Sequence, residues 1–369
     1  MSATMTTRPD RNPGADVDEL VRPRISRALH TSIITASVLV ALAVNALLGD
    51  VKWGWVVMLA APVYLVAIRV AARLIEDRRQ ATDRTVTAIV TMSFLLVMMP
   101  LISVFWTVIS EGAARLDGTF LRGTMRLTPE ELMSQRDGAA VGGAYHAMMG
   151  TLIITGLAAA IAVPLGLFTA IYLVEYGRGK LARAITTMVD VMTGIPSIVA
   201  GLFAYALFII VFGPGSRTGV AGGVALSVLM TPVVVRSAEE MLKLVPNELR
   251  EASYALGVPK WKTIVKVVLP TAIAGILTGI TLAIARVIGE TAPLLVAAGL
   301  AQDTNYNPFD GRMTSLPVFT YYQYVQPGVP TEAGVQRAWA AALMLVIIVA
   351  VLFTLARVLA RVLRPKGLQ

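Results

Sequence analysis

Two charged residues stand in one of the most apolar stretches of the sequence. In ARVIGETAPLL, residues 285–295, Arg286 and Glu290 are four positions apart. Arginine keeps its proton, and a charge at the centre of a membrane-spanning helix costs at least about 2.5 kcal/mol. Arg286 is therefore expected to face protein, water or an anion. A planar guanidinium donates to two oxygens at once, so phosphate, sulfate and molybdate would all suit it.

The residues around this pair favour a lined cavity over a pair that only neutralises its own charge. Residues four apart share a helix face, so Glu290 can pair with Arg286 and hold helices together, although Arg before Glu is the weaker order. Gly289 leaves backbone exposed, and Pro293 withdraws the hydrogen bond from the Gly289 carbonyl. A helix broken beside charge is typical of a substrate path, so Arg286, Gly289 and Glu290 are predicted to line one. Glu290 would then hold Arg286 while no anion is bound, or pair with an arginine of a partner chain.

A second chemically suggestive segment is RSAEEMLKLVPNELREASYALGVPKWKTIVKVVLP, residues 236–270. Apolar residues recur at helical spacing up to Leu256, Gly257 can end a helix in the left-handed conformation, and Pro259 suits the start of another. We expect two short helices that meet at a glycine turn, with Leu256, Val258 and Trp261 near its apex. Such an apolar knuckle favours a protein partner, although an amphipathic helix on lipid head groups would show a similar pattern.

A third segment, TMVDVMTGIPSIVAGLF, combines helix-weakening residues with a hydroxyl. Gly194, Pro196 and Gly201 weaken a helix, and Ser197 can satisfy a freed carbonyl. Pro196 and Ser197 are therefore predicted to mark a kink that lines the path. Close helix packing through the small residues is the alternative.

Other chemistry is missing from the sequence. The chain has no Cys and two His, so a disulfide, a thiolate metal site and a metal cluster are not expected. It contains no G-x-x-x-x-G-K-[ST] phosphate loop, and therefore nothing that would hydrolyse ATP. Paired carboxylates, a nucleophile elbow and an H-E-x-x-H motif are also missing, so the chain is not expected to be an enzyme. Asp190 and His146 are expected to be structural.

Membrane-spanning helices must position these residues. Hydrophobic residues make up 56% of the 369 residues and charged residues 15%, and the mean hydropathy is +0.70, whereas a soluble domain needs about 25% charged residues. The sequence therefore predicts an all-α integral membrane protein, a polytopic helical bundle. With about 20 residues per span, eight spans are predicted: 28–48, 53–72, 86–109, 147–174, 186–212, 218–236, 268–299 and 338–360.

The predicted spans divide the chain into three parts. Residues 1–27 are expected to be a disordered cytoplasmic tail, residues 28–80 an additional N-terminal transmembrane hairpin, and residues 81–369 a domain with the other six spans and the cytoplasmic loop 236–270. Most of the 32 Lys and Arg residues lie in segments that fall on one side of the membrane. Both termini are therefore predicted to be cytoplasmic, and the net charge of +9 does not indicate nucleic acid.

The run EASYALGVPKWKTIVKVVLP resembles the EAA loop of ABC importer permeases. Glu251 and Ala252 match its first two positions, Ser253 replaces the second Ala, and Gly257 follows four positions later. Val267 replaces Ile in the later I-x-L-P. The resemblance implies a coupling helix that docks into a groove of a cytoplasmic ATPase. The residues assigned to this coupling are Glu251, Ala252, Ala255, Leu256, Gly257, Pro259 and Trp261.

Further strings narrow the resemblance. GGAYHAMMGTL, IYLVEYG, GIPSIVAGLF, VPNELREASYALG, LAIARVIGETAPLL and LPVFTYYQY occur in the same order as in the PstA-type permease family of phosphate-specific ABC importers, over about residues 86–365. This resemblance implies a six-span type I ABC importer permease core, to which the first two spans are an addition. It also implies that Arg286 and Glu290 are needed for transport, and it selects phosphate among the oxyanions.

The resemblance further implies a non-catalytic permease subunit that forms half of a phosphate path and works by alternating access in a bacterial inner (plasma) membrane. Its expected partners are a second related permease, two copies of an ATPase that bind ATP and Mg, an extracytoplasmic phosphate-binding protein and membrane lipid, with no cofactor in this chain. The alternatives are a self-contained secondary anion transporter, a permease for sulfate or molybdate, and a membrane receptor or scaffold. Secondary transporters often contain two inverted repeats, which are not evident here.

Overall fold

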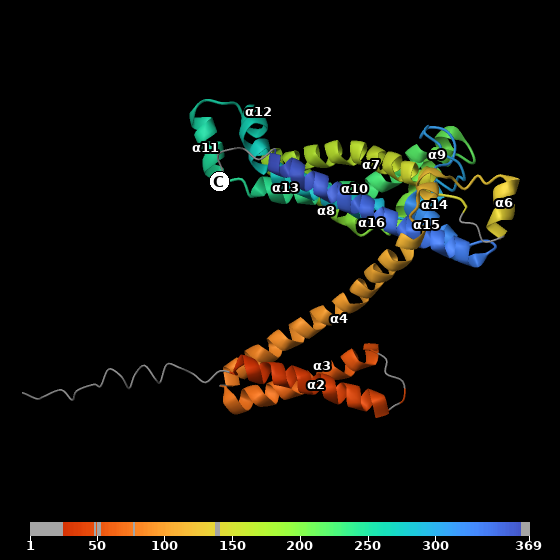
Figure 1. Ribbon diagram of the computed structural model, residues 1–369. Helices are drawn as coiled ribbons and strands as arrows, with labels where there is room; N and C mark the ends of the chain where they lie inside the picture. The colour runs from red at the N-terminus through yellow and green to blue at the C-terminus, as the bar shows by residue number, and fades with distance from the viewer. Residues whose placement is uncertain (1–24, 48, 50–52, 77, 137–140, 363–369) are drawn as a thin grey trace, which may run out of the picture. The chain divides into compact units, whose positions relative to one another are not determined.

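The computed structural model describes residues 25–47, 49, 53–76, 78–136 and 141–362. Within these ranges the regular structure is entirely helical (Figure 1). Seven helices are long and apolar enough to cross a membrane, and a bent pair of shorter helices supplies an eighth possible span. The predicted all-α polytopic bundle is confirmed. Most of the predicted tail, residues 1–24, lies outside the described residues.

The chain forms two compact units, which meet in sequence between Phe105 and Trp106. The N-terminal unit contains α2 (Arg27–Leu47), α3 (Trp53–Ile75) and the first part of α4 (Arg78–Arg115). Ile68 packs with Ala81 and Ala88 of α4 in its core. The predicted hairpin of residues 28–80 is therefore only part of this unit, because α4 supplies a third helix to the same core.

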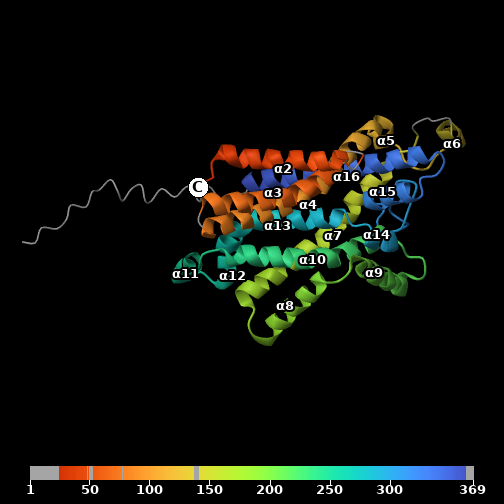
Figure 2. The ribbon, with the colours of Figure 1, turned by 90° about the horizontal axis from the view of Figure 1, so that it is seen from below.

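The main unit, from Trp106 onward, carries all the predicted site residues. Helix α10 is central, because 61% of its apolar 18-residue segment is buried. The corresponding value is 28% for the helix that ends with α13 and 28% for α16. It packs against α7, α13 and α8, and Figure 2 shows it between the last two. The elements after α4 are α5 (Gly118–Arg122), α6 (Pro129–Arg136), α7 (Tyr145–Ile171), η1 (Tyr172–Tyr176), α8 (Gly179–Thr193), α9 (Ser197–Phe212), α10 (Gly219–Lys243), α11 (Asn247–Ala255), α12 (Lys260–Thr263), η2 (Ile264–Val268), α13 (Leu269–Ile288), α14 (Ala292–Ala297), α15 (Leu316–Val325) and α16 (Thr331–Val362).

Small residues allow close packing in the main unit. A β-carbon on Gly166 of α7 would lie 2.7 Å from a side-chain atom of Val234 in α10, a distance too short for any larger residue. The π-helical turn η1 continues α7, and the π-helical turn η2 directly precedes α13. The turn between α11 and α12 lies at one end of the unit, and α9, α14 and α15 lie at the other (Figure 1). The predicted coupling loop and the predicted helix breaks are thus at opposite ends of the bundle.

Candidate functional site

The helix that carries Arg286 ends within two residues of it. Helix α13 stops at Ile288, and Gly289 has a φ of −90° and a ψ of 0°, outside the helical region. Pro293 lies in the first turn of α14 and has no N–H to donate back toward Gly289. The predicted helix break is confirmed. The predicted single span 268–299 is wrong at this end, because the glycine and the proline divide it into α13 and α14.

Arg286 and Glu290 do not form an ion pair in the part of the chain that the structure describes. Arg286 is exposed on α13, whereas Glu290 is half-buried in the connection to α14. The spacing of four residues brings two side chains together only if the helix continues, and here it ends between them. Within this chain, Arg286 is therefore not neutralised by the carboxylate that the sequence placed nearest to it.

A second break divides the predicted span 186–212. Helices α8 and α9 are separated by Gly194–Pro196 and bent by 107°. Ser197 is the first residue of α9, but in the described structure its hydroxyl does not satisfy a freed carbonyl. The predicted kink is confirmed as a sharp bend, because a proline and a glycine within three residues leave the helix without its regular hydrogen bonds.

The two broken segments meet where Gly201 of α9 faces Pro293 of α14. A β-carbon on Gly201 would lie 2.5 Å from the Cα and 2.7 Å from the carbonyl oxygen of Pro293. Only a residue without a side chain allows the two backbones to approach so closely. Close packing through small residues, the alternative for this segment, is thus present together with the break.

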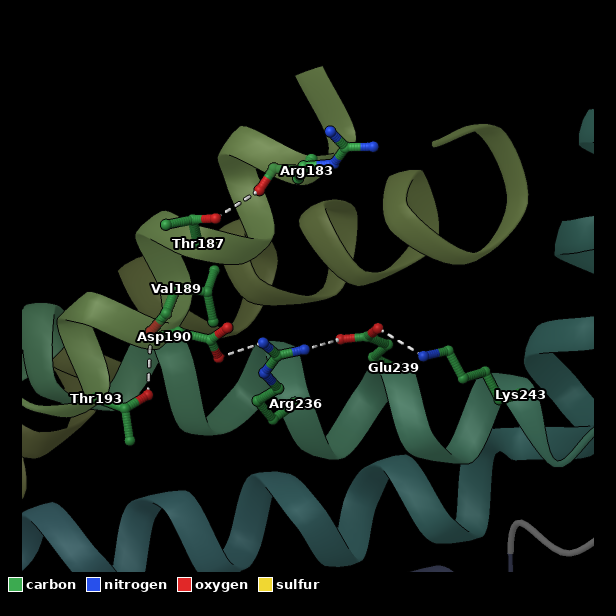
Figure 3. A network of polar contacts seen from close by, with 8 residues as sticks. All are labelled: Arg183, Thr187, Val189, Asp190, Thr193, Arg236, Glu239 and Lys243. Atoms are coloured by element: carbon green, nitrogen blue, oxygen red, sulfur yellow. Dashed lines mark hydrogen bonds and ion pairs between the residues drawn. The ribbon is translucent and has the colours of Figure 1, made fainter. Parts of the chain in front are cut away.

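Polar side chains join α8 to α10. Figure 3 shows Asp190 of α8 and Arg236 of α10 pointing toward one another, and their side chains form an ion pair. Arg236 also donates to Glu239 at 2.8 Å, and Lys243 donates to the same carboxylate at 2.7 Å. The structural role expected for Asp190 is supported. Its partner could not be read from spacing, but the charges at 236, 239 and 243 are at helical spacing and predict their own part of the network.

The predicted coupling segment has the expected form. Helix α11 ends at Ala255, Gly257 is left-handed with a φ of 73°, and α12 starts after Pro259. Gly257 donates its N–H to the Tyr254 carbonyl at 2.9 Å, and Val258 donates to the Ser253 carbonyl at 3.2 Å. These two bonds close the helix end in the manner typical of a glycine C-cap. The prediction of two short helices joined by a glycine turn is confirmed.

The turn presents apolar side chains to the outside of this chain. Leu256 is 83% exposed and Trp261 is 58% exposed. Exposed apolar groups of this size, gathered at one turn, are typical of a surface that another protein covers. The remaining residues assigned to coupling are exposed as well: Glu251, Ala252, Ala255, Gly257 and Pro259.

An ion pair that sequence reasoning missed fastens this turn to the bundle. Arg250 of α11 lies 3.0 Å from the Glu175 carboxylate in η1, and their side chains are 12% and 5% exposed. The same guanidinium donates to the carbonyls of Leu242 and Val245, at the end of α10, at 2.9 Å and 2.6 Å. Lys260 of α12 donates to the Glu175 carbonyl. Contacts of Arg250 and Glu175 thereby tie η1, the end of α10, α11 and α12 together.

The departure of the sequence from E-A-A at Ser253 also has a structural reason. The Ser253 hydroxyl is buried and lies 2.8 Å from the hydroxyl of Thr263 in α12. An alanine at position 253 would leave the buried Thr263 hydroxyl without this partner. The serine therefore links the two helices of the turn.

Comparisons with known proteins place this geometry in a family. Residues 162–367 match the family described as "Binding-protein-dependent transport system inner membrane component". The "Phosphate transport system permease protein PstA 1" of Mycobacterium tuberculosis (strain ATCC 25618 / H37Rv) is 48% identical over 275 residues, which cover 74% of this chain and 85% of that protein. The PstA protein of Yersinia pestis is 38% identical over 292 residues, which cover 78% and 95%. A solved inward-facing MetNI methionine ABC transporter is 20% identical, with a TM-score of 0.48, and the match covers 64% of this chain and 100% of that chain.

Proposed function

Because the chain belongs to the family of binding-protein-dependent transport system inner membrane components, we propose that it is the transmembrane permease subunit of an ATP-driven importer of inorganic phosphate. The observation that carries the proposal is Arg286, which is exposed beside a helix break and has no ion-pair partner among the described residues. A guanidinium in this position suits a tetrahedral oxyanion. Relatives named as phosphate permeases, at 48% and 38% identity, support phosphate over sulfate or molybdate.

In this proposal the chain supplies half of the anion path, and a second, related permease supplies the other half. Arg286, Gly289 and Glu290 line the path at the break after α13, and Pro196 and Ser197 line it at the break before α9. Glu290 holds Arg286 between transport cycles, or pairs with an arginine of the second permease. The exposure of Arg286 on this chain supports a position facing the path or the other permease.

The exposed turn between α11 and α12 is proposed to dock into a groove of a cytoplasmic ATPase. Leu256 and Trp261 would supply apolar contact, and Glu251 a charged contact at the edge. The contacts of Arg250 with Glu175 and with the end of α10 support this role, because they give a force on the turn a direct route into the bundle.

Energy and specificity come from the partners in this proposal. Two ATPase copies bind ATP and Mg, so this chain needs no cofactor and performs no hydrolysis. Closure of the ATPases draws the two coupling turns together and opens the path outward, where an extracytoplasmic binding protein releases phosphate. Hydrolysis then resets the path. The chain would be a multi-pass protein of a bacterial inner (plasma) membrane, with both termini cytoplasmic.

Reconstitution tests the proposal directly. The chain is incorporated into proteoliposomes with its second permease and ATPase, with ATP at the ATPase and labelled phosphate on the binding protein. Uptake that requires ATP and is competed by unlabelled phosphate, but not by sulfate or molybdate, is the expected result. Phosphate uptake that proceeds without the ATPase would support the secondary transporter instead. ATP-dependent uptake of sulfate or molybdate but not phosphate would reassign the substrate.

A further inference from the structure

Two arginines lie side by side at the end of the main unit away from α11 and α12. Arg217 is in the connection between α9 and α10, and Arg312 is in the connection between α14 and α15. Gly299 lies between them, with a φ of 79° that favours glycine. A β-carbon on Gly299 would lie 3.2 Å from the Cδ of Arg312 and 3.3 Å from the Cδ of Arg217. The glycine therefore brings two positive side chains together that are 95 positions apart in sequence.

Neither arginine has an ion-pair partner within the described ranges. The guanidinium carbon of Arg217 lies 5.2 Å from the centre of the Tyr205 ring, a cation–π contact that leaves its charge uncompensated. Arg126, also in a connecting segment, instead donates to Asp303 at 3.0 Å, which lowers the pKa of that carboxyl. Two like charges placed together repel one another, and an anion bound between them would remove that repulsion.

The connecting segments that carry the two arginines are held in place. Thr218, next to Arg217, donates its N–H to the Ala297 carbonyl at 3.2 Å, and Met313, next to Arg312, donates to the Ala298 carbonyl at 3.2 Å. The two acceptors are the last residue and the C-cap of α14, directly before Gly299. The backbone beside each arginine is therefore held by a hydrogen bond to the end of α14. A site positioned in this way binds with a smaller loss of conformational freedom.

The two side chains line a cavity of about 510 Å³. Gln302 and Tyr322 line it as well, so neutral hydrogen-bond donors accompany the two charges. Two guanidinium groups with neutral donors around a recess match the chemistry of a tetrahedral oxyanion.

We propose that Arg217 and Arg312 form a binding site for orthophosphate at the outer end of the chain, distinct from Arg286. The site would receive phosphate as the binding protein releases it, before the ion reaches the path. The choice of phosphate as ligand and of the outer side rests on the proposed function. The arrangement of the two arginines does not.

A single engineered cysteine tests the charge and the ligand together. The chain contains no natural Cys, and Val296 is a half-buried residue that lines the cavity. Val296→Cys in the reconstituted full chain is treated with anionic or cationic methanethiosulfonate reagents, and labelling of this chain is followed by intact mass. We expect the ratio of anionic to cationic rates to fall about tenfold in the Arg217→Gln, Arg312→Gln background, because the local positive potential is lost. Millimolar phosphate should slow the anionic reagent only when both arginines are present.

Arg126→Gln is the matched control, because Arg126 already pairs with Asp303 and does not line this cavity. It should leave the ratio and the phosphate protection unchanged. An unchanged ratio in the double variant, or phosphate protection that survives without both arginines, would overturn the site.

Transport measurements separate this site from a docking contact. At saturating loaded binding protein, the Arg217→Gln, Arg312→Gln variant should take up phosphate several-fold more slowly, while the concentration of binding protein that gives half-maximal ATP hydrolysis stays the same. If that concentration rises instead and uptake at saturation is normal, the arginines bind acidic groups of the binding protein and the proposal fails. A wild-type chain that transports no phosphate would contradict the proposed function. Normal phosphate transport by the Val296→Cys chain, without phosphate protection of its engineered thiol, would contradict this site alone.

Discussion

The Arg250 guanidinium and the Glu175 carboxylate form an ion pair at 3.0 Å between the helix of the exposed turn and the π-helical end of α7. Both side chains are largely shielded, at 12% and 5% exposure. The pair lies directly behind the surface that we propose to bind the ATPase. The role of the pair can be tested apart from that surface, because neither Arg250 nor Glu175 is one of the exposed residues assigned to coupling.

Arg250→Gln should weaken the connection between the turn and the bundle. Loss of one partner from a shielded pair leaves the other charge uncompensated, which costs about 3 to 5 kcal/mol. We expect a lower unfolding temperature and fewer phosphate ions transported per ATP hydrolysed. Arg178→Gln is the control, since Arg178 is exposed near the same helix end. A normal ratio of transport to hydrolysis in a folded Arg250→Gln transporter would remove the pair from the coupling route.

The glycine turn offers a substitution that separates backbone strain from loss of contact. Gly257 is left-handed, and a β-carbon there would meet nothing within 4 Å, so only the backbone opposes a side chain. Gly257→Val should distort the turn at a cost of about 1 to 2 kcal/mol or more, whereas Gly257→Asn should be better tolerated. We expect Val, but not Asn, to reduce co-purification of the ATPase while membrane insertion stays normal. Equal co-purification for both variants would contradict a shape-dependent docking turn.

Charge at the same turn gives an independent measurement. Glu251 is exposed, so Glu251→Lys should leave the stability of the chain nearly unchanged. If the residue contacts the ATPase, the charge reversal should weaken ATPase binding and slow uptake several-fold. Unchanged ATPase affinity at low salt would place Glu251 outside the contact.

The close approach of Gly201 to Pro293 should tolerate no added methyl group. Gly201→Ala places a β-carbon 2.5 Å from the Pro293 Cα, so one backbone must move, at a cost of about 1 to 3 kcal/mol. We expect lower thermal stability and slower uptake. Gly156→Ala in α7 is the control, because a β-carbon there meets nothing within 4 Å, and it should be neutral or stabilising. Equal stability of the two variants would show that α9 and α14 separate without cost.

Arg286 provides the most direct test of the anion path. A charge-assisted hydrogen bond contributes about 1.5 to 3 kcal/mol, so Arg286→Ala should reduce phosphate uptake roughly 10- to 100-fold. Arg286→Lys keeps the charge but loses the two-pronged donor, and should be partly or wholly inactive. Glu290→Gln should impair turnover more than anion entry. Labelled phosphate uptake at matched protein levels measures all three.

The double variant Arg286→Ala, Glu290→Ala decides between the path and a structural pair. If each charge serves only to neutralise the other after a conformational change, removing both should restore uptake. We expect no recovery, because the anion would still have lost its guanidinium.

The parts of the site that depend on local chain chemistry could be predicted from the sequence. Gly257 and Pro259 act through their own backbone preferences, so the turn between α11 and α12 followed from residue type and order. Hydropathy located the spans because it also depends only on residue types along a short stretch of chain. The break at Gly194–Pro196 was also placed, but its angle of 107° was not, because the angle depends on what α8 and α9 pack against.

Contacts between distant segments could not be predicted in this way. Arg250 and Glu175 are 75 positions apart, and nothing in the spacing of either residue points to the other. The reverse error occurred at Arg286 and Glu290, where a spacing of four suggested a pair. That rule holds only in an unbroken helix, and the end of α13 at Ile288 removes its premise.

The π-helical turn η2, Ile264–Val268, contains one residue more than an α-helical turn would at this point. Each residue in an α-helix advances by about 100°, but the wider π turn takes up its extra residue within one revolution. Deletion of one residue there should therefore restore a regular helix and leave α12 at nearly the same rotation about the axis of α13. A deletion inside the regular part of α13 would instead rotate α12 by about 100° relative to the end of α13, and would turn Trp261 away from its present direction.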